Sequence, residues 1–211
     1  MDVAAIRRQF PVTDRMVFLN NAAESPLSLP VRRRLDEYLD QAACAPDRRP
    51  PARHPVRPLL SRLLGGSADE YALVTSTGVG IGVAAAGYPW APGDNFVVPA
   101  GEHWNNTFPW LALRTRGVDV RVVPLGADQR LDPAQVAERV DDQTRMVAAA
   151  AVNHLTGFRA DLRRLSGIAR GCGALFVVDG VQGAGVVPLN VDDDGIDVLA
   201  GALAQRTDVG E

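Results

Sequence analysis

The chain contains no lysine, because all 22 of its basic residues are arginine. A lysine amine is the side-chain group that forms a Schiff base with an aldehyde cofactor. Covalent chemistry of that kind therefore has no side-chain donor in these 211 residues, and the N-terminal amine alone remains. Abundant Ala, Arg, Gly and Val are typical of a GC-rich genome. Such a bias explains a low lysine content, but it would rarely remove a catalytic lysine.

Cysteine, long apolar runs and excess charge are also scarce. Cys44 and Cys172 lack the spacing of metal ligands, so we expect reduced structural thiols. No apolar run reaches the roughly 18 residues needed to span a membrane, and no charged-then-apolar leader opens the chain. A net charge of −3 provides no basic field for nucleic acid or anionic lipid. We therefore expect a cytoplasmic protein with neither kind of partner.

The first third of the chain is predicted to be an N-terminal arm with helices, residues 1–70. A short helix extends to about Phe10, and apolar side chains at helical spacing predict a second helix over 30–43. A segment rich in Pro and Arg follows and is predicted to be a loop, in which His54 is exposed.

Residues 71–211 alternate between short β-rich runs and helical segments. Strands are predicted near 71–75, 95–99, 119–123, 146–151 and 174–178. Helices are predicted at about 79–88, 105–116, 132–140 and 160–171. Because the strand runs are apolar on both faces, they predict an α/β domain, a mostly parallel sheet with helices on both faces. Functional loops of such a sheet leave the carboxyl ends of its strands.

The first predicted strand is followed by a glycine-rich segment that opens a helix. Gly78, Gly80 and Gly82 let backbone N–H groups approach a phosphate, and Ser76 and Thr77 add hydroxyl groups. Glycine also serves to pack a helix against a strand, so the segment alone is not specific.

A dinucleotide site is an alternative interpretation of the same segment. Gly80, Gly82 and Ala85 fit the relaxed fingerprint, and Glu102 follows the next strand about 20 residues later. A long helical arm before the first strand does not belong to that pattern.

The remaining strand ends supply an aromatic face, amide groups and a carboxylate. These residues are His103 and Trp104 after the second run, Asn153 and His154 after the fourth, and Asp179 after the fifth. A carboxylate at the end of a buried strand needs a partner, and a protonated pyridine nitrogen is one. A local turn or helix cap is the alternative role for Asp179. Together the strand ends indicate a pyridoxal-phosphate pocket better than a dinucleotide one.

The chain resembles the class V aminotransferases of pyridoxal-phosphate fold type I, a group that includes cysteine desulfurases, selenocysteine lyases and isopenicillin-N-epimerase-like proteins. The resemblance runs from about Ile6 to Ala200. It rests on FLNNAAESPL, LVTSTGVGI, PGDNFVVPAGEHWNNTFPWLALRTRGVDVRVVPL, VNHLTGFRADL and LFVVDGVQGAGVVPLNVDDDGIDVLA, in that order.

The resemblance implies a role for each matching position around the cofactor. For the ring these are His103, which stacks on it; Asp179, the partner of its nitrogen; Gln182, a donor to its hydroxyl; and Asn153, near that hydroxyl or the substrate. For phosphate they are Thr77 and Gly78, and for substrate Asn21 and Ala22.

The chain also departs from the family pattern. Gly78 and Val79 stand where the family usually has a hydroxyl residue and Glu, and Gly82 stands where it has Asn, which weakens phosphate binding. The family's His-Lys pair aligns with Ala204 and Gln205. A carboxamide neither forms an imine nor accepts the substrate's α-proton, so Gln205 cannot replace the lysine.

These departures leave three hypotheses. The first is a truncated copy or pseudoenzyme that binds pyridoxal phosphate non-covalently at most, since the family chain continues well beyond this point. The second is a repurposed enzyme or binding protein that uses no covalent cofactor, with His103, His154 and Asp179 as acid–base groups. The third is a regulatory partner of a full-length homologue. Fold type I sites generally form at dimer interfaces, so the resemblance also implies a homo-oligomer or such a complex.

Overall fold

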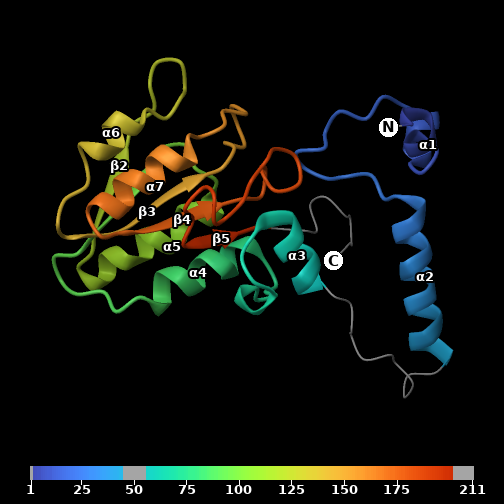
Figure 1. Ribbon diagram of the computed structural model, residues 1–211, viewed down its shortest axis with the longest axis horizontal. Helices are drawn as coiled ribbons and strands as arrows, with labels where there is room; N and C mark the ends of the chain where they lie inside the picture. The colour runs from blue at the N-terminus through green and yellow to red at the C-terminus, as the bar shows by residue number, and fades with distance from the viewer. Residues whose placement is uncertain (1, 45–55, 202–211) are drawn as a thin grey trace. The chain divides into compact units, whose positions relative to one another are not determined.

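The computed structural model describes residues 2–44 and 56–201 (Figure 1). These residues fall into two units, one before residue 56 and one from Val56 onward. The first unit contains helix α1 (Val3–Arg7), the 3₁₀ turn η1 (Pro11–Asp14) and helix α2 (Leu29–Cys44). The Leu29 N–H donates to the Gln9 carbonyl over 2.8 Å, which fastens the start of α2 to the segment after α1. Both helices predicted for the arm are confirmed.

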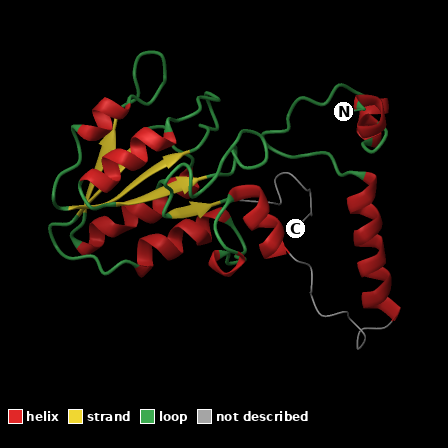
Figure 2. Ribbon diagram, viewed as in Figure 1, coloured by secondary structure: helices red, strands yellow, loops and turns green. Residues whose placement is uncertain are grey.

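The second unit is built on a parallel sheet of five strands in the order β2-β1-β3-β4-β5 (Figure 2). The strands are β1 (Asn95–Pro99), β2 (Asp119–Val123), β3 (Thr144–Ala150), β4 (Leu175–Asp179) and β5 (Val198–Ala200). The helices are α3 (Val56–Leu64), α4 (Thr77–Gly87), α5 (Phe108–Leu111), α6 (Pro133–Ala137) and α7 (Leu162–Gly171). Short 3₁₀ segments are η3 (Ala68–Glu70), η4 (Trp104–Asn106) and η5 (Ala112–Arg116). The predicted α/β fold is confirmed.

Helices cover both faces of this sheet, as its doubly apolar strands require (Figure 1). Helices α6 and α7 pack on one face, where Phe176 and Leu165 are fully buried. Helices α4 and α5 pack on the other, where the rings of Phe96 and Trp110 stack with centroids 4.2 Å apart. None of the helices in the described residues is long and apolar enough to cross a membrane.

The prediction of a strand near 71–75 is wrong. That run forms no strand, and Leu73 and Val74 are 61% and 46% exposed. A strand requires a hydrogen-bonding neighbour, and the edges of the described sheet are β2 and β5. Apolar composition alone does not provide that neighbour. The fifth strand is instead β5, a three-residue element that the sequence analysis did not predict.

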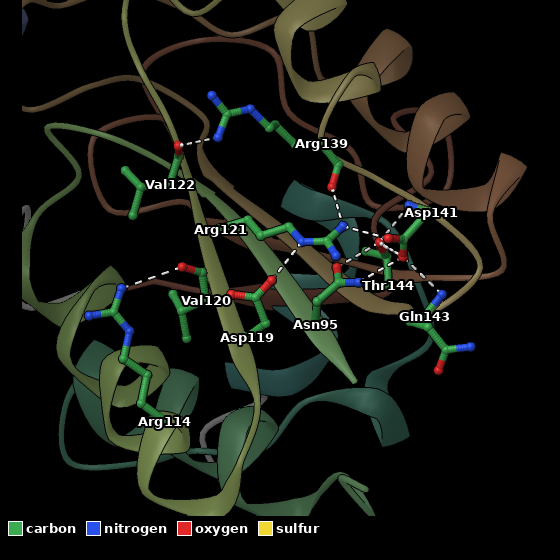
Figure 3. A network of polar contacts seen from close by, with 10 residues as sticks. All are labelled: Asn95, Arg114, Asp119, Val120, Arg121, Val122, Arg139, Asp141, Gln143 and Thr144. Carbon is green, nitrogen blue, oxygen red and sulfur yellow. Dashed lines mark hydrogen bonds and ion pairs between the residues drawn. The ribbon is translucent and has the colours of Figure 1, made fainter. Parts of the chain in front are cut away.

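A polar network joins the amino ends of β1, β2 and β3 (Figure 3). Asn95 donates to Asp141 and accepts from the Thr144 hydroxyl, both over 2.7 Å. Arg121 donates to Asp141 over 2.7 Å and to Asp119 over 2.9 Å. Its guanidinium lowers the pKa of Asp141 to about 2, with further help from the Asn95 amide. This end of the sheet is thus held by paired charge.

Two arginine side chains cover the outer edge of β2. The Val123 carbonyl accepts the Ala100 N–H on the β1 side, so the alternate carbonyls of Val120 and Val122 point away from the sheet. Arg114 donates to the first and Arg139 to the second, each over 3.4 Å (Figure 3). The outward acceptors of this edge strand are therefore already engaged.

Candidate functional site

The strand order reverses at β1, since β2 lies on one side of it and β3 on the other. In open α/β sheets a ligand binds outside the carboxyl ends of the strands at such a switch point. The loops that leave this edge follow Pro99, Ala150 and Asp179. They contain four of the residues that the resemblance assigns to the cofactor ring or substrate, His103, Asn153, Asp179 and Gln182.

The loops after β1 and β3 are joined directly. The Asn153 side-chain amide donates to the Gly101 carbonyl over 3.0 Å. The imidazole rings of His103 and His154 meet edge to face with centroids 5.0 Å apart. Burial and the nearby His103 lower the pKa of His154. The structure therefore brings three predicted site residues together at the switch point.

Asn153 uses its remaining oxygen within its own turn. Its Oδ1 accepts the N–H groups of Leu155 and Thr156 over 3.0 and 3.1 Å. This amide orients two loops and closes a turn, so its described contacts are structural. Its implied place near a ring hydroxyl stays a prediction.

Asp179 ends β4 and is 5% exposed. Its Oδ1 accepts the Val181 N–H over 2.9 Å, which is the local turn role that the sequence allowed. Burial raises the pKa of Asp179, while the hydrogen bond from Val181 and the nearby His103 act in the opposite direction. A carboxylate in this position gains from a cationic N–H partner more than a solvated one would.

Glu102 is the residue that sequence reasoning missed, because it appeared only as the ribose-binding acid of the dinucleotide alternative. Its two oxygens accept the Ala150 N–H and the Asn106 side-chain amide, each over 3.0 Å. Burial raises the pKa of Glu102, and the charge of Asp179 adds to this. A carboxylate engaged inside the protein does not suit a ribose. The signal that could have found it is the one used for Asp179, an acid just after a buried strand.

The start of α4 lies against the loop after β1. Thr77 is the first residue of this helix and is 4% exposed, and the Ser76 hydroxyl accepts the Val79 N–H over 3.2 Å. A Cβ on Gly78 would lie 3.1 Å from the Asn105 side-chain oxygen, so glycine permits this close approach. The Asn105 N–H in turn donates to His103 Nδ1 over 3.2 Å. The predicted phosphate residues and the predicted ring-stacking residue thus share one edge.

The remaining predicted residues lie in several parts of the chain. Asn21 and Ala22 lie in a turn of the first unit, and Gln182 lies in the turn after β4. His54, Ala204 and Gln205 fall outside the described residues. Trp104 is 62% exposed, and its ring lies 4.3 Å from that of His103.

The donor set suits a planar anionic cofactor rather than a metal ion. Among the described residues, no group of three or more His, Cys, Asp or Glu side chains could hold a metal. Asp179 offers a carboxylate to a protonated ring nitrogen, His103 an aromatic ring, and α4 the N–H groups of its first turn. These residues fit pyridoxal phosphate held without a covalent bond, because the chain has no lysine to form one.

Comparison with known proteins identifies the family of the chain. The family model described as aminotransferase class V matches residues 17–202. A probable cysteine desulfurase of Methanothermobacter thermautotrophicus is 32% identical over 203 residues, covering 92% of this chain and 51% of that protein. The chain therefore spans about half the length of the curated relatives it matches.

Solved structures show the same fold. A cysteine desulfurase of Escherichia coli superposes with a TM-score of 0.85 at 25% identity, covering 96% of this chain and 54% of that one. A C-DES variant with glycine covalently linked to its PLP cofactor superposes with a TM-score of 0.86 at 19% identity, covering 97% and 57%. The five-stranded parallel sheet and its helices match the large domain of pyridoxal-phosphate fold type I. The chain belongs to the class V aminotransferase family.

Proposed function

We propose that this chain binds pyridoxal phosphate non-covalently at the carboxyl edge of its sheet and does not perform Schiff-base catalysis with its own side chains. The observation that supports this most is Asp179, a buried carboxylate at the end of β4 whose pKa is raised by burial, while the Val181 hydrogen bond and the nearby His103 act in the opposite direction. Such a group is stabilised when a cationic ring nitrogen arrives beside it.

Each residue of the edge has a part in holding the cofactor. Asp179 keeps a proton on the ring nitrogen by accepting a charge-assisted hydrogen bond from it. His103 offers its ring to the cofactor's face, and the first turn of α4 with Thr77 binds the phosphate. Bound pyridoxal phosphate supplies an electron sink for carbanions. The proton at a substrate's α-carbon has no lysine to accept it in this chain, and the carboxamide of Gln205 cannot do so.

Cofactor titration followed by reduction tests this proposal. We expect the absorbance of pyridoxal phosphate to shift in a saturable way, and borohydride followed by peptide mass spectrometry to find no adduct within residues 71–205. Asp179→Asn keeps the oxygen that accepts from Val181 but removes the charge, so it should weaken binding about tenfold or more. Asp142→Asn is the matched control, since this aspartate is exposed and lies near the opposite end of the sheet.

Two results would count against the proposal. A reduced adduct on a side chain within 71–205 would show covalent attachment. Equal affinities of the Asp179→Asn and Asp142→Asn variants would place the cofactor elsewhere.

A cofactor-independent acid–base protein is the second candidate. It is favoured by the raised pKa values of Glu102 and Asp179 beside the lowered pKa of His154, because unlike shifts in one place are typical of proton-transfer sites. A thermal-shift survey of small amino and keto acids without pyridoxal phosphate tests this. Stabilisation that is lost in His154→Ala would favour it over cofactor binding.

The chain is also proposed to assemble, as a homo-oligomer or with a full-length relative. Helix α4 is apolar on all sides, with Val79 and Val83 46% and 63% exposed, and Leu73 beside it in sequence is 61% exposed. Exposed apolar surface of this kind favours association. Sedimentation at micromolar concentration should show a dimer or larger species, and a cooperatively folding monomer would contradict this.

A further inference from the structure

The carboxylate of Glu102 sits in the middle of a chain of hydrogen bonds that runs into the core. At one end, the Ala150 N–H donates to Oε1 over 3.0 Å. At the other, Asn106 donates to Oε2 over 3.0 Å, and the Trp110 indole N–H donates to the oxygen of Asn106 over 3.1 Å. Asn106 and Trp110 are fully buried, so none of their polar atoms can turn to water instead.

The direction of every bond in this chain is fixed. An indole N–H can only donate, so the oxygen of Asn106 faces Trp110 and its amide N–H₂ faces Glu102. The backbone N–H of Ala150 is a donor too. Glu102 must therefore accept at both oxygens, which a carboxylate does and a carboxamide cannot. The two accepted hydrogen bonds favour the ionised form, although burial and Asp179 raise the pKa of Glu102.

This one carboxylate joins the loop after β1 to the end of β3, which in turn pairs with the end of β4. Glu102 belongs to the loop after β1 and is followed directly by His103. Ala150, which it holds, is the last residue of β3 and pairs in register with Asp179 of β4. The distances among His103, His154 and Asp179 therefore depend on how the β1 loop is fastened to β3.

We propose that Glu102 is the positioning residue of this site. Its carboxylate fastens the loop that contains His103 to the end of β3, and it does so through the fixed polarity of the Trp110–Asn106–Glu102–Ala150 chain. It acts through other residues and has no oxygen left over from these bonds to be the main contact of a ligand. The proposal deepens the proposed cofactor site, but its main test does not use the cofactor.

The test compares Glu102→Gln with the double variant Glu102→Gln/Asn106→Asp. In the single variant a donor faces a donor, either at Ala150 or at Asn106. In the double variant the introduced aspartate accepts from both Trp110 and the new glutamine amide, while the glutamine oxygen accepts from Ala150. Every bond is restored, and the charge has moved by one residue in the network. Asp197→Asn is the control, since Asp197 accepts a strand N–H, that of Phe176, over 2.7 Å at the amino end of β4.

The readout is the imidazole NMR spectrum, which is simple because the chain has 3 histidines. We expect the His103–His154 inter-ring cross-peaks and the His154 titration to change in Glu102→Gln, to return in the double variant and to stay unchanged in Asp197→Asn. Affinity for pyridoxal phosphate should fall about tenfold in Glu102→Gln and recover in the double variant. A loss of this size is typical for residues that hold the directly binding side chains in place.

Unchanged imidazole contacts in Glu102→Gln would overturn the proposal. So would a folded double variant that fails to regain them, since charge at position 102 would then be the requirement. If Glu102→Gln alone does not fold, the double variant decides: retained histidine contacts support positioning and lost contacts reject it. Absence of cofactor binding in all variants, with the imidazole results as expected, would reject the proposed function alone.

Discussion

The two ends of the same sheet treat carboxylates in opposite ways. At the amino ends, Asp141 is paired with Arg121 over 2.7 Å and Asp94 with Arg145 over 2.7 Å, and the pKa of Asp141 is lowered to about 2. At the carboxyl ends, Glu102 and Asp179 accept from uncharged N–H groups and burial raises the pKa of both. Carboxylates at the amino end are paired with arginine, whereas those at the carboxyl end are held by hydrogen bonds from uncharged N–H groups. The two ends of a strand, about 20 Å apart, therefore have different roles: the amino end contributes to stability and the carboxyl end forms the candidate site.

The largest expected effect on stability is at Trp110, which links the core to the loop after β1. Trp110→Ala should lower the free energy of unfolding by about 3–5 kcal/mol, because it removes the ring that stacks on Phe96 and leaves a cavity. Urea unfolding followed by circular dichroism measures this. Trp110→Phe keeps most of the packing and removes only the N–H, so it should cost much less. Equal losses in the two variants would mean that the Asn106 bond, rather than packing, matters most here.

A smaller loss is expected at the amino end. Asn95→Leu should lower the free energy of unfolding by about 2 kcal/mol, because it removes the buried acceptor of the Thr144 hydroxyl and one of the donors to Asp141. Cofactor affinity should not change, since this network lies at the opposite end of the sheet. A weakened affinity in a folded Asn95→Leu variant would show that the two ends are coupled.

At the carboxyl end, removing charge should stabilise. Because burial raises the pKa of Asp179, its ionisation opposes folding once the pH exceeds the pKa in the unfolded chain. Asp179→Asn should therefore raise the free energy of unfolding by about 1 kcal/mol at pH 7 while it weakens cofactor binding about tenfold or more. The gain should disappear at acidic pH, where the carboxyl is protonated in both states. A destabilised Asp179→Asn variant would mean that the carboxylate is already stabilised without a ligand.

The smallest effect concerns a partly exposed ion pair. Asp141 has a folded pKa of about 2 against 3.8 as its ordinary value, so its contribution to stability is complete above pH 3.8 and is lost as the pH falls through about 2. Arg121→Met should remove that contribution, by less than about 1 kcal/mol because the Asp141 side chain is 41% exposed. Unfolding at pH 7 and pH 2 should show a larger difference at pH 7 than at pH 2. Arg130→Met, at an exposed pair, is the matched control.

Much of the sheet could be predicted because its central strands are apolar on both faces, as parallel strands covered by helices must be. Residues 95–99 match β1, in which all five residues are buried, for that reason, and residues 119–123 match the edge strand β2. Strand β5 has three residues, too few to show a pattern. The run at 71–75 shows the converse, since its composition favours a strand but no described strand pairs with it.

The site could be predicted in part by noting which polar residues follow the strands. That reasoning found His103, Asn153 and Asp179. It did not find the task of Glu102, because the direction of its side chain depends on the loop, where Gly101 has a φ of 69°. The left-handed backbone at Gly101 changes the direction of the chain after β1, and the pattern of apolar residues does not predict this turn. Likewise, the orientation of Asn106 depends on Trp110, four residues along the chain, rather than on any motif.

Arg114 and Arg139, which are bonded to the outer carbonyls of β2, make the two edges of the sheet unequal as sites for an additional strand. Carbonyl groups that already accept from Arg114 and Arg139 are less available to an incoming strand, so β2 is a protected edge strand. A strand added to this domain, whether by gene fusion, by circular permutation or by swapping between copies, would join more readily beyond β5 than beyond β2. A designer who grafts a hairpin there would extend the architecture, whereas the same graft at β2 would first have to displace two guanidinium groups.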